Sequence, residues 1–135
     1  MPSQLLSDEA LRVLAEHFAT DYTLRTIQEE FDNADIDCDE HHRSSDMSER
    51  RGLVYMYYHT LDLTNSADVH KVLSVFESVL SKLELRTGNV HGGDFAHEQA
   101  CKTLARLTGL LREDGFLYEG GTITSSANSP SSRYL

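Results

Sequence analysis

The stretch ADVHKVLSVFESVLSKLEL, from Ala67 to Leu85, decides the fold class of this chain. Its apolar residues recur at intervals of three and four, which is the spacing of residues along one side of an α-helix. These apolar residues are Val69, Val72, Leu73, Phe76, Val79, Leu80 and Leu83. Because the apolar stripe is wide, we expect this helix to lie at the centre of a helical core.

Two shorter segments with the same periodicity precede this helix and predict a helical hairpin from Leu5 to Ala34. The first segment begins at Ser7, whose hydroxyl is suited to cap the free amides at the start of a helix. The expected inward-facing residues of the two segments are Leu11, Leu14, Phe18, Leu24, Ile27 and Phe31. The hairpin and the long helix together indicate a mainly α protein.

Two further segments, one on each side of the long helix, complete the predicted set of helices. We expect Ser48 to cap a third helix that ends at Leu61, and a fifth helix to run from about Asp94 to Glu113. Their expected inward-facing residues are Leu53, Tyr57 and Leu61 in the third helix, and Phe95, Ala100, Leu104, Leu107 and Leu111 in the fifth.

The C-terminal residues predict a change from helix to strand. Two short runs flank the pair Gly120-Gly121, a pattern typical of a β-hairpin. The residues from Ser125 onward are rich in Ser, Asn and Pro and predict a disordered tail. The predicted fold is therefore a compact bundle of about five helices with a short C-terminal β-hairpin. We expect one helical domain over residues 1–124 and a disordered tail over residues 125–135.

The composition excludes several classes of protein. A chain of 135 residues with 39% hydrophobic and 25% charged residues fits one globular domain. No apolar run approaches the roughly 20 residues that span a membrane, and the first residues lack a secretory signal. Two cysteines make no disulfide framework, so we expect a cytoplasmic protein, with a single Cys38–Cys101 bridge as the alternative.

The charge of the chain indicates what kind of partner it takes. Its 22 acidic and 12 basic residues give a net charge of −10, which repels nucleic acid and favours a protein partner with a basic surface. An acidic inhibitor that occupies the nucleic-acid site of a target enzyme is one alternative. A winged-helix-like regulator is another, but its hairpin would carry Glu119 and no Lys or Arg to meet phosphates.

Two short spacings are weak candidates for metal binding. Cys38 and His41 are three residues apart, and His97 and Cys101 lie four apart on one face of the fifth helix. We expect no metal and no other cofactor, with Cys101 packed as a small buried hydrophobe and His97 at the helix edge. The alternating acids that begin at Asp35 resemble a calcium loop but lack its glycine and its final glutamate.

No pattern of residues predicts catalysis. The sequence contains no nucleophile elbow, no phosphate-binding glycine loop and no His-Glu-x-x-His motif. We therefore expect a protein that is not an enzyme and that acts by binding.

An acidic segment followed by an aromatic helix is the best candidate for a contact surface. Residues 32–49 carry seven carboxylates and little apolar content, so we expect a loop, and the third helix contains the run Tyr55-Met56-Tyr57-Tyr58. Carboxylates steer a basic partner, while aromatic side chains give a large contact area. The candidate partner-binding residues are Asp35, Asp37, Asp39, Tyr55 and Tyr58. A solvated acidic surface is the simpler interpretation, and a homo-oligomer through the third helix stays open.

Six short stretches occur in an order that resembles the N-terminal helical domains of abortive-infection phage-resistance proteins. They are Leu6-Ser7-Asp8, Tyr22-Thr23-Leu24-Arg25, Ser48-Glu49-Arg50-Arg51, Leu61-Asp62-Leu63-Thr64, Val69-His70-Lys71-Val72-Leu73 and Leu111-Arg112-Glu113-Asp114-Gly115-Phe116. In that family a separate effector holds the chemistry, so the resemblance carries over no catalytic residue. It implies a recognition or adaptor module of an antiphage defence system, acting in trans or cut from a larger chain.

Overall fold

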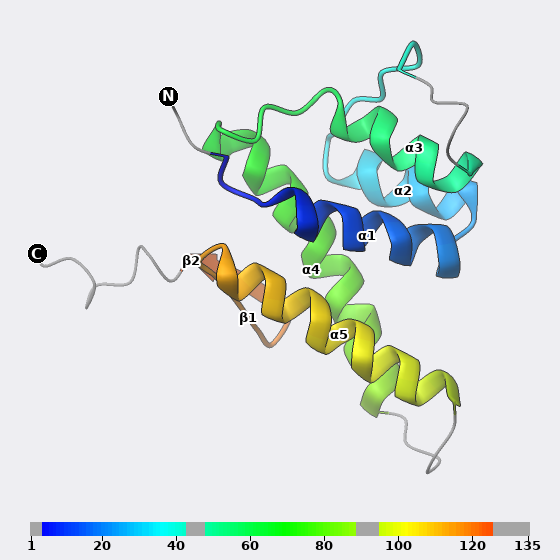
Figure 1. Cartoon of the computed structure of the whole chain (residues 1–135), viewed down its shortest axis with the longest axis vertical. Helices are drawn as coiled ribbons and strands as arrows, with labels where there is room; N and C mark the ends of the chain where they lie inside the picture. The colour runs from blue at the N-terminus through cyan, green and yellow to red at the C-terminus, as the bar shows by residue number, and fades with distance from the viewer. Residues whose placement is uncertain (1–3, 43–47, 89–94, 126–135) are drawn as a thin grey trace, which may run out of the picture. The chain divides into compact units, whose positions relative to one another are not determined.

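The mainly α fold with a C-terminal hairpin is present in the computed structural model, which describes residues 4–42, 48–88 and 95–125. Within these ranges the chain forms five helices and a two-stranded hairpin, whose arrangement can be followed in Figure 1. Their bounds are α1 (Asp8–Asp21), α2 (Leu24–Asn33), α3 (Glu49–Tyr58), α4 (Ser66–Gly88), α5 (Phe95–Glu113), β1 (Phe116–Glu119) and β2 (Thr122–Ser125). In the described part of the chain, no helix is both long and apolar enough to cross a membrane.

Side-chain caps begin the first three helices. The Ser7 hydroxyl accepts a hydrogen bond from the Ala10 amide at 3.2 Å, and the Ser48 hydroxyl accepts one from the Arg51 amide at 3.2 Å. At the start of α2, Thr23 and Thr26 exchange hydrogen bonds between hydroxyl and main-chain amide. Each cap satisfies amides that have no partner inside the helix, and this confirms Ser7 and Ser48 as helix starts.

The turn that ends α2 fixes the backbone conformation of the first residues of the acidic segment. Asp35 adopts a left-handed conformation with φ 62°, and the Ile36 amide then donates to the carbonyl of Phe31 at 3.1 Å. The Asp35 amide donates in the same way to Asp32, which completes the Schellman motif that ends many helices. Ile36 is buried beside this turn, so the acidic segment has an apolar anchor. The predicted tail beyond Ser125 and residues 43–47 lie outside the described residues.

The chain divides into two compact units, Met1–Phe76 and Glu77–Leu135. In the first unit, α3 packs against both α1 and α2, and an aromatic row joins them. The Phe31 ring lies 5.5 Å from the Phe18 ring and stacks on the Tyr57 ring at 4.6 Å between centroids. All seven predicted apolar residues of α4 are buried, which confirms the stripe that predicted this helix.

Several details of the predicted helices are wrong. Helix α3 ends at Tyr58 rather than Leu61, and Leu53 and Leu61 are only half-buried. Because α3 has neighbours on two sides, Val54 and Met56 are buried instead. Leu24, predicted to face inward, is 39% exposed because it is the first residue of α2. In α5, Ala100, Leu107 and Leu111 are buried and Leu104 is half-buried, and the Phe95 side chain lies outside the description.

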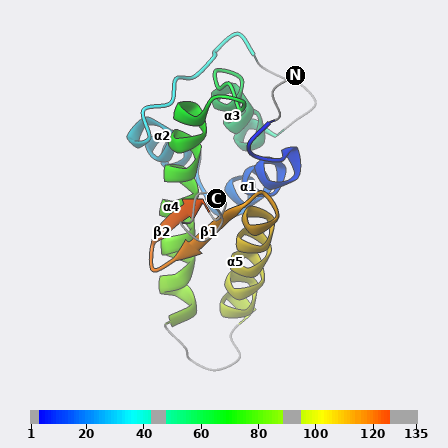
Figure 2. The ribbon, with the colours of Figure 1, turned by 90° about the vertical axis from the view of Figure 1, so that its left-hand side faces the viewer.

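In the second unit, the β-hairpin lies beside α5 and the second half of α4 (Figure 2). The two strands are antiparallel, with Glu119 opposite Thr122, and both glycines of the turn have positive φ. The Ile123 amide donates a 2.7 Å hydrogen bond to the Glu77 carboxylate of α4. The predicted hairpin is therefore confirmed, with Ser125 as its last residue rather than the first residue of the tail.

Candidate partner-binding site

A pocket of about 550 Å³ lies in the first unit, and we call it the Tyr55 pocket. It is formed by the start of α1, the end of α3 and the turn before α4. Its lining residues are Asp8, Glu9, Leu11, Arg12, Tyr55, Tyr58 and Leu63. Leu11 and Tyr58 are buried, Tyr55 and Leu63 are half-buried, and the charged residues are exposed. The pocket thus has an apolar, aromatic wall and a charged rim.

Two tyrosines with different environments form the aromatic wall. The hydroxyl of Tyr58 donates a buried hydrogen bond to the Leu11 carbonyl at 2.8 Å, and burial raises its pKa well above the ordinary value. Tyr55 meets the Tyr58 ring edge-on, with centroids 5.3 Å apart. Tyr58 is therefore a fixed part of the core, whereas Tyr55 presents ring surface to the pocket.

The rim is acidic on balance. Arg12 pairs with Glu9 and, at 2.7 Å, with Glu16, and the bond to Glu9 is the largest of the effects that raise the pKa of its guanidinium. Asp8 accepts a 2.8 Å hydrogen bond from the uncharged amide of Gln4. The rim thus carries two carboxylates, Asp8 and Glu9, against the one guanidinium of Arg12, which leaves one surplus negative charge at the start of this helix.

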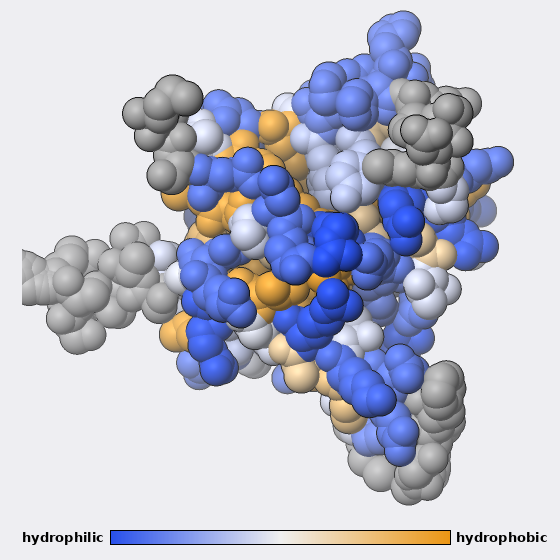
Figure 3. Space-filling view, viewed as in Figure 1, coloured by the Kyte–Doolittle hydropathy of each residue, from blue (hydrophilic) through white to orange (hydrophobic). Residues whose placement is uncertain are grey.

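Further apolar surface lies next to the pocket. Leu5 is 39% exposed, and its amide donates a 2.8 Å hydrogen bond to the Leu63 carbonyl, which places Leu5 beside the pocket wall. Figure 3 shows apolar surface beside the start of α1, bordered by hydrophilic side chains. Apolar surface rimmed by polar groups is characteristic of protein-interaction sites.

The acidic segment is held at the end of α3 by Asp39. The Asp39 amide donates to the Met56 carbonyl at 2.9 Å, and its carboxylate lies 2.6 Å from Nδ1 of His59. The contact with His59, together with a hydrogen bond from the His41 amide, lowers the pKa of Asp39. The rings of His42 and His59 stack at 3.9 Å. We call this set the Asp39 clasp: it anchors the segment, and its carboxylate already has a partner.

The structure separates the five predicted contact residues. Tyr55 and Tyr58 line the Tyr55 pocket, next to α1. Asp39 belongs to the clasp, while Asp35 and Asp37 are exposed on the same segment. Sequence reasoning did not find Asp8, Glu9, Leu11 and Leu63 as members of a site. Asp8 and Glu9 were visible as acids in a first helical turn, but their place beside Tyr55 depends on how α1 packs against α3.

Tyr57, the remaining tyrosine of α3, belongs to the core. Tyr57 donates a 3.3 Å hydrogen bond to the Asp32 carboxylate and stacks on Phe31. Burial, with a smaller contribution from the charge of Asp32, raises the pKa of Tyr57 to about 12. Tyr57 is therefore not available to a partner.

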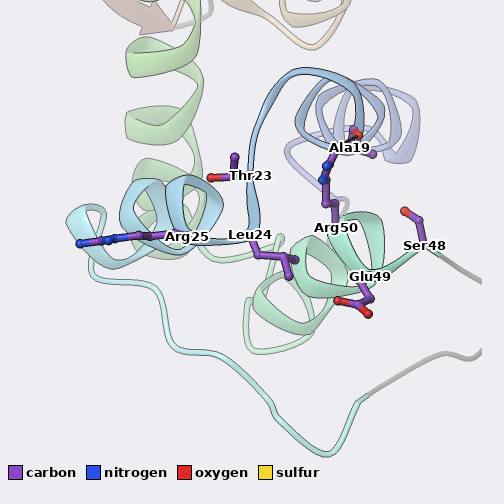
Figure 4. A pocket seen from close by; sticks show the side chains of 7 residues that line it. All are labelled: Ala19, Thr23, Leu24, Arg25, Ser48, Glu49 and Arg50. Carbon is purple, nitrogen blue, oxygen red and sulfur yellow. Dashed lines mark hydrogen bonds between the residues drawn. The ribbon is translucent and has the colours of Figure 1, made fainter.

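A second pocket, of about 540 Å³, lies where α1 ends and α2 and α3 begin (Figure 4). Arg50 reaches across it and donates a 3.1 Å hydrogen bond to the Ala19 carbonyl. Figure 4 shows Arg25 directed away from Arg50, and Arg25 pairs with Glu29 on its own helix. The two arginines therefore do not converge on a common ligand, and we assign this pocket a structural role.

The weak metal candidates fall into two pairs that lie in different units. Cys38 is half-buried and His41 exposed, whereas Nε2 of His97 lies 3.6 Å from Sγ of Cys101. Neither Cys38 nor Cys101 forms a disulfide. The expectation that Cys101 is buried is wrong, because Ala100 takes the buried position and Cys101 is exposed beside it. Among the residues that the structure describes, no three His, Cys, Asp or Glu side chains are placed to hold a metal ion.

No protein-family model matches this chain, and neither a curated protein nor a solved structure matches it significantly.

Proposed function

We propose that this chain is a non-catalytic protein-interaction module that binds a partner protein at the Tyr55 pocket. The observation that carries the proposal is the half-buried Tyr55 ring in an apolar pocket with a polar rim. Exposed aromatic side chains in such pockets supply much of the binding free energy of protein interfaces, because they bury a large area with few rotatable bonds.

The chemistry of the pocket supports binding rather than catalysis. Asp8 and Glu9 are exposed on the rim, whereas general acid–base catalysis uses groups held in a cleft from which water is excluded. Glu9 is already paired with Arg12, and the Tyr58 hydroxyl is committed to Leu11. The side chains that line the pocket are thus arranged to hold a surface and not to activate a nucleophile.

The resemblance to abortive-infection proteins supports a setting for this activity. We propose that the module serves as a cytoplasmic recognition or adaptor part of a bacterial antiphage defence system. In that setting the effector chemistry belongs to the partner, and the Tyr55 pocket supplies the contact.

The net charge of −10 favours a second candidate, an acidic inhibitor that occupies the nucleic-acid site of an enzyme. Such a complex depends on many long-range charge contacts and weakens steeply as salt screens them. A complex that depends mainly on the Tyr55 ring keeps most of its affinity at high salt. Measuring the dissociation constant between 0.1 and 1 M salt therefore separates the two candidates.

The test begins with a partner captured from the source cells by the whole chain and continues with both proteins purified. We expect Tyr55→Ser to weaken the complex at least about tenfold, as loss of an interface anchor does, and Tyr55→Phe to change it less than about threefold. Leu24→Ser is the matched control, since it also replaces a large, solvent-accessible side chain with serine, but Leu24 lines the second pocket. Unchanged affinity in Tyr55→Ser, with an unchanged circular dichroism spectrum, would refute the proposal.

A further inference from the structure

The charge around the Tyr55 pocket indicates what it binds. We infer that its occupant is a basic peptide segment, with an apolar side chain against Tyr55 and a lysine or arginine at Asp8 and Glu9. This inference rests on the proposed function, because it names the partner chemistry of the same site.

The surplus charge of the rim selects a cation. Asp8 and Glu9 lie next to each other on the rim, and Arg12, which also pairs with Glu16 further along α1, neutralises only one of these two charges. The helix dipole places roughly half a positive charge at the start of α1, which opposes a cation. The carboxylates outweigh this partial charge, and Ser7 already satisfies one of the amides from which it arises. An acidic segment would be repelled from this rim, whereas a basic one is attracted.

The wall of the pocket selects an apolar group beside that cation. The inner part of the pocket is lined by Leu11, Leu63 and Tyr58, none of which is charged. A cation alone would therefore leave this apolar surface in contact with water. A purely apolar segment would instead cover Asp8 and remove its carboxylate from water with only the uncharged amide of Gln4 as a partner, which is unfavourable. Only a segment that carries both groups satisfies the wall and the rim together. A cation near the face of Tyr55 gains further attraction from the ring.

The exposed Leu5 extends the wall along the chain. It lies next to Leu63, so a bound segment of several residues keeps contact with apolar surface after it leaves the pocket. We therefore expect at least two apolar positions in the bound segment, with the basic residue adjacent to one of them.

The test is a selection of random 12-residue peptides, displayed on phage, against the immobilised whole chain, with Tyr55→Ser as the counter-selection. We expect the enriched peptides to share a lysine or arginine next to a leucine, methionine or aromatic residue. The best peptide is then synthesised and its dissociation constant measured against purified variants.

Two variants with the same change in net charge separate a local effect of charge from a general one. Asp8→Asn with Glu9→Gln removes two negative charges from the rim, and Asp35→Asn with Asp37→Asn removes two from the acidic segment. We expect the first pair to weaken binding of the synthetic peptide about fivefold to tenfold at low salt, and the second pair by less than twofold. The difference should shrink in 1 M salt.

The outcomes distinguish the inference from the proposed function. Peptides that require Tyr55 but carry no basic residue, or that bind both charge variants equally, overturn the inference and leave the function standing. Peptides that bind Tyr55→Ser as tightly as the wild type, or a selection without any Tyr55-dependent peptide, overturn both.

Discussion

The Tyr58 hydroxyl donates a hydrogen bond of 2.8 Å to the main-chain carbonyl of Leu11, and so ties α3 to α1 inside the first unit. The same tyrosine forms part of the wall of the Tyr55 pocket. The stability of the α1–α3 pair and the shape of the proposed binding site therefore depend on one buried side chain.

Tyr58→Phe should lower the free energy of unfolding by about 1 kcal/mol, because a buried hydrogen bond is lost while the ring stays in place. Urea denaturation followed by circular dichroism measures this change. Tyr55→Phe is the matched control on the same helix and should change stability less, since Tyr55 is only half-buried. Equal losses in the two variants would show that the Tyr58–Leu11 bond adds nothing.

The protein should lose stability in alkali through Tyr57. Burial raises the pKa of this phenol from about 10 to about 12, so the folded state favours the protonated form. The stabilisation is fully present below pH 10 and is lost as the pH rises towards 12, by up to about 2 kcal/mol. Unfolding free energies measured between pH 8 and 12 should fall less steeply in Tyr57→Phe than in the wild type. Parallel curves would contradict the assignment.

The acid side of the stability curve should depend on Asp39. Its pKa is lowered by the contact with His59, so the folded state favours the ionised carboxylate. The stabilisation is present above the unfolded pKa of about 4 and is lost as the pH falls through the lower folded value. Asp39→Asn should be less stable than the wild type at pH 6, and the two melting temperatures should converge below about pH 3. A constant difference across this range would refute the role of the carboxylate.

The left-handed residue at the end of α2 gives a test of backbone strain. Asp35 has φ 62°, a conformation that glycine adopts freely and a β-branched residue resists. Asp35→Gly should raise the free energy of unfolding by a few tenths of a kcal/mol, and Asp35→Val should lower it by about 1 kcal/mol or more. Asp37→Gly and Asp37→Val serve as controls at an exposed neighbour. If Asp35→Val were more stable than Asp35→Gly, the Schellman turn would be disproved.

Local patterns were sufficient to predict the elements. The stripe of α4, the caps Ser7 and Ser48, and the hairpin around Gly120-Gly121 all depend on residues within a few positions of one another. Helix periodicity and turn conformation are properties of such short stretches, so they can be read without knowledge of the packing.

The aromatic run of α3 could not be interpreted in this way. Tyr57 and Tyr58 point about 100° apart on a helix, and both are buried because α2 lies on one side and α1 on the other. Periodicity assumes one buried face, so it placed Leu53, Tyr57 and Leu61 inside. Only Tyr57 of these three is buried, and the burial of Tyr58 on the other side of the helix was not predicted.

The sequence by itself determined that this protein is mainly helical and acidic and that a β-hairpin follows its last predicted helix, because those properties follow from composition and from spacing along the chain. Only the tertiary structure decided which tyrosine faces a pocket and which carboxylates border it. The pocket joins α1, α3 and Leu63, residues distant in sequence, and their approach follows from side-chain packing between helices rather than from any local preference.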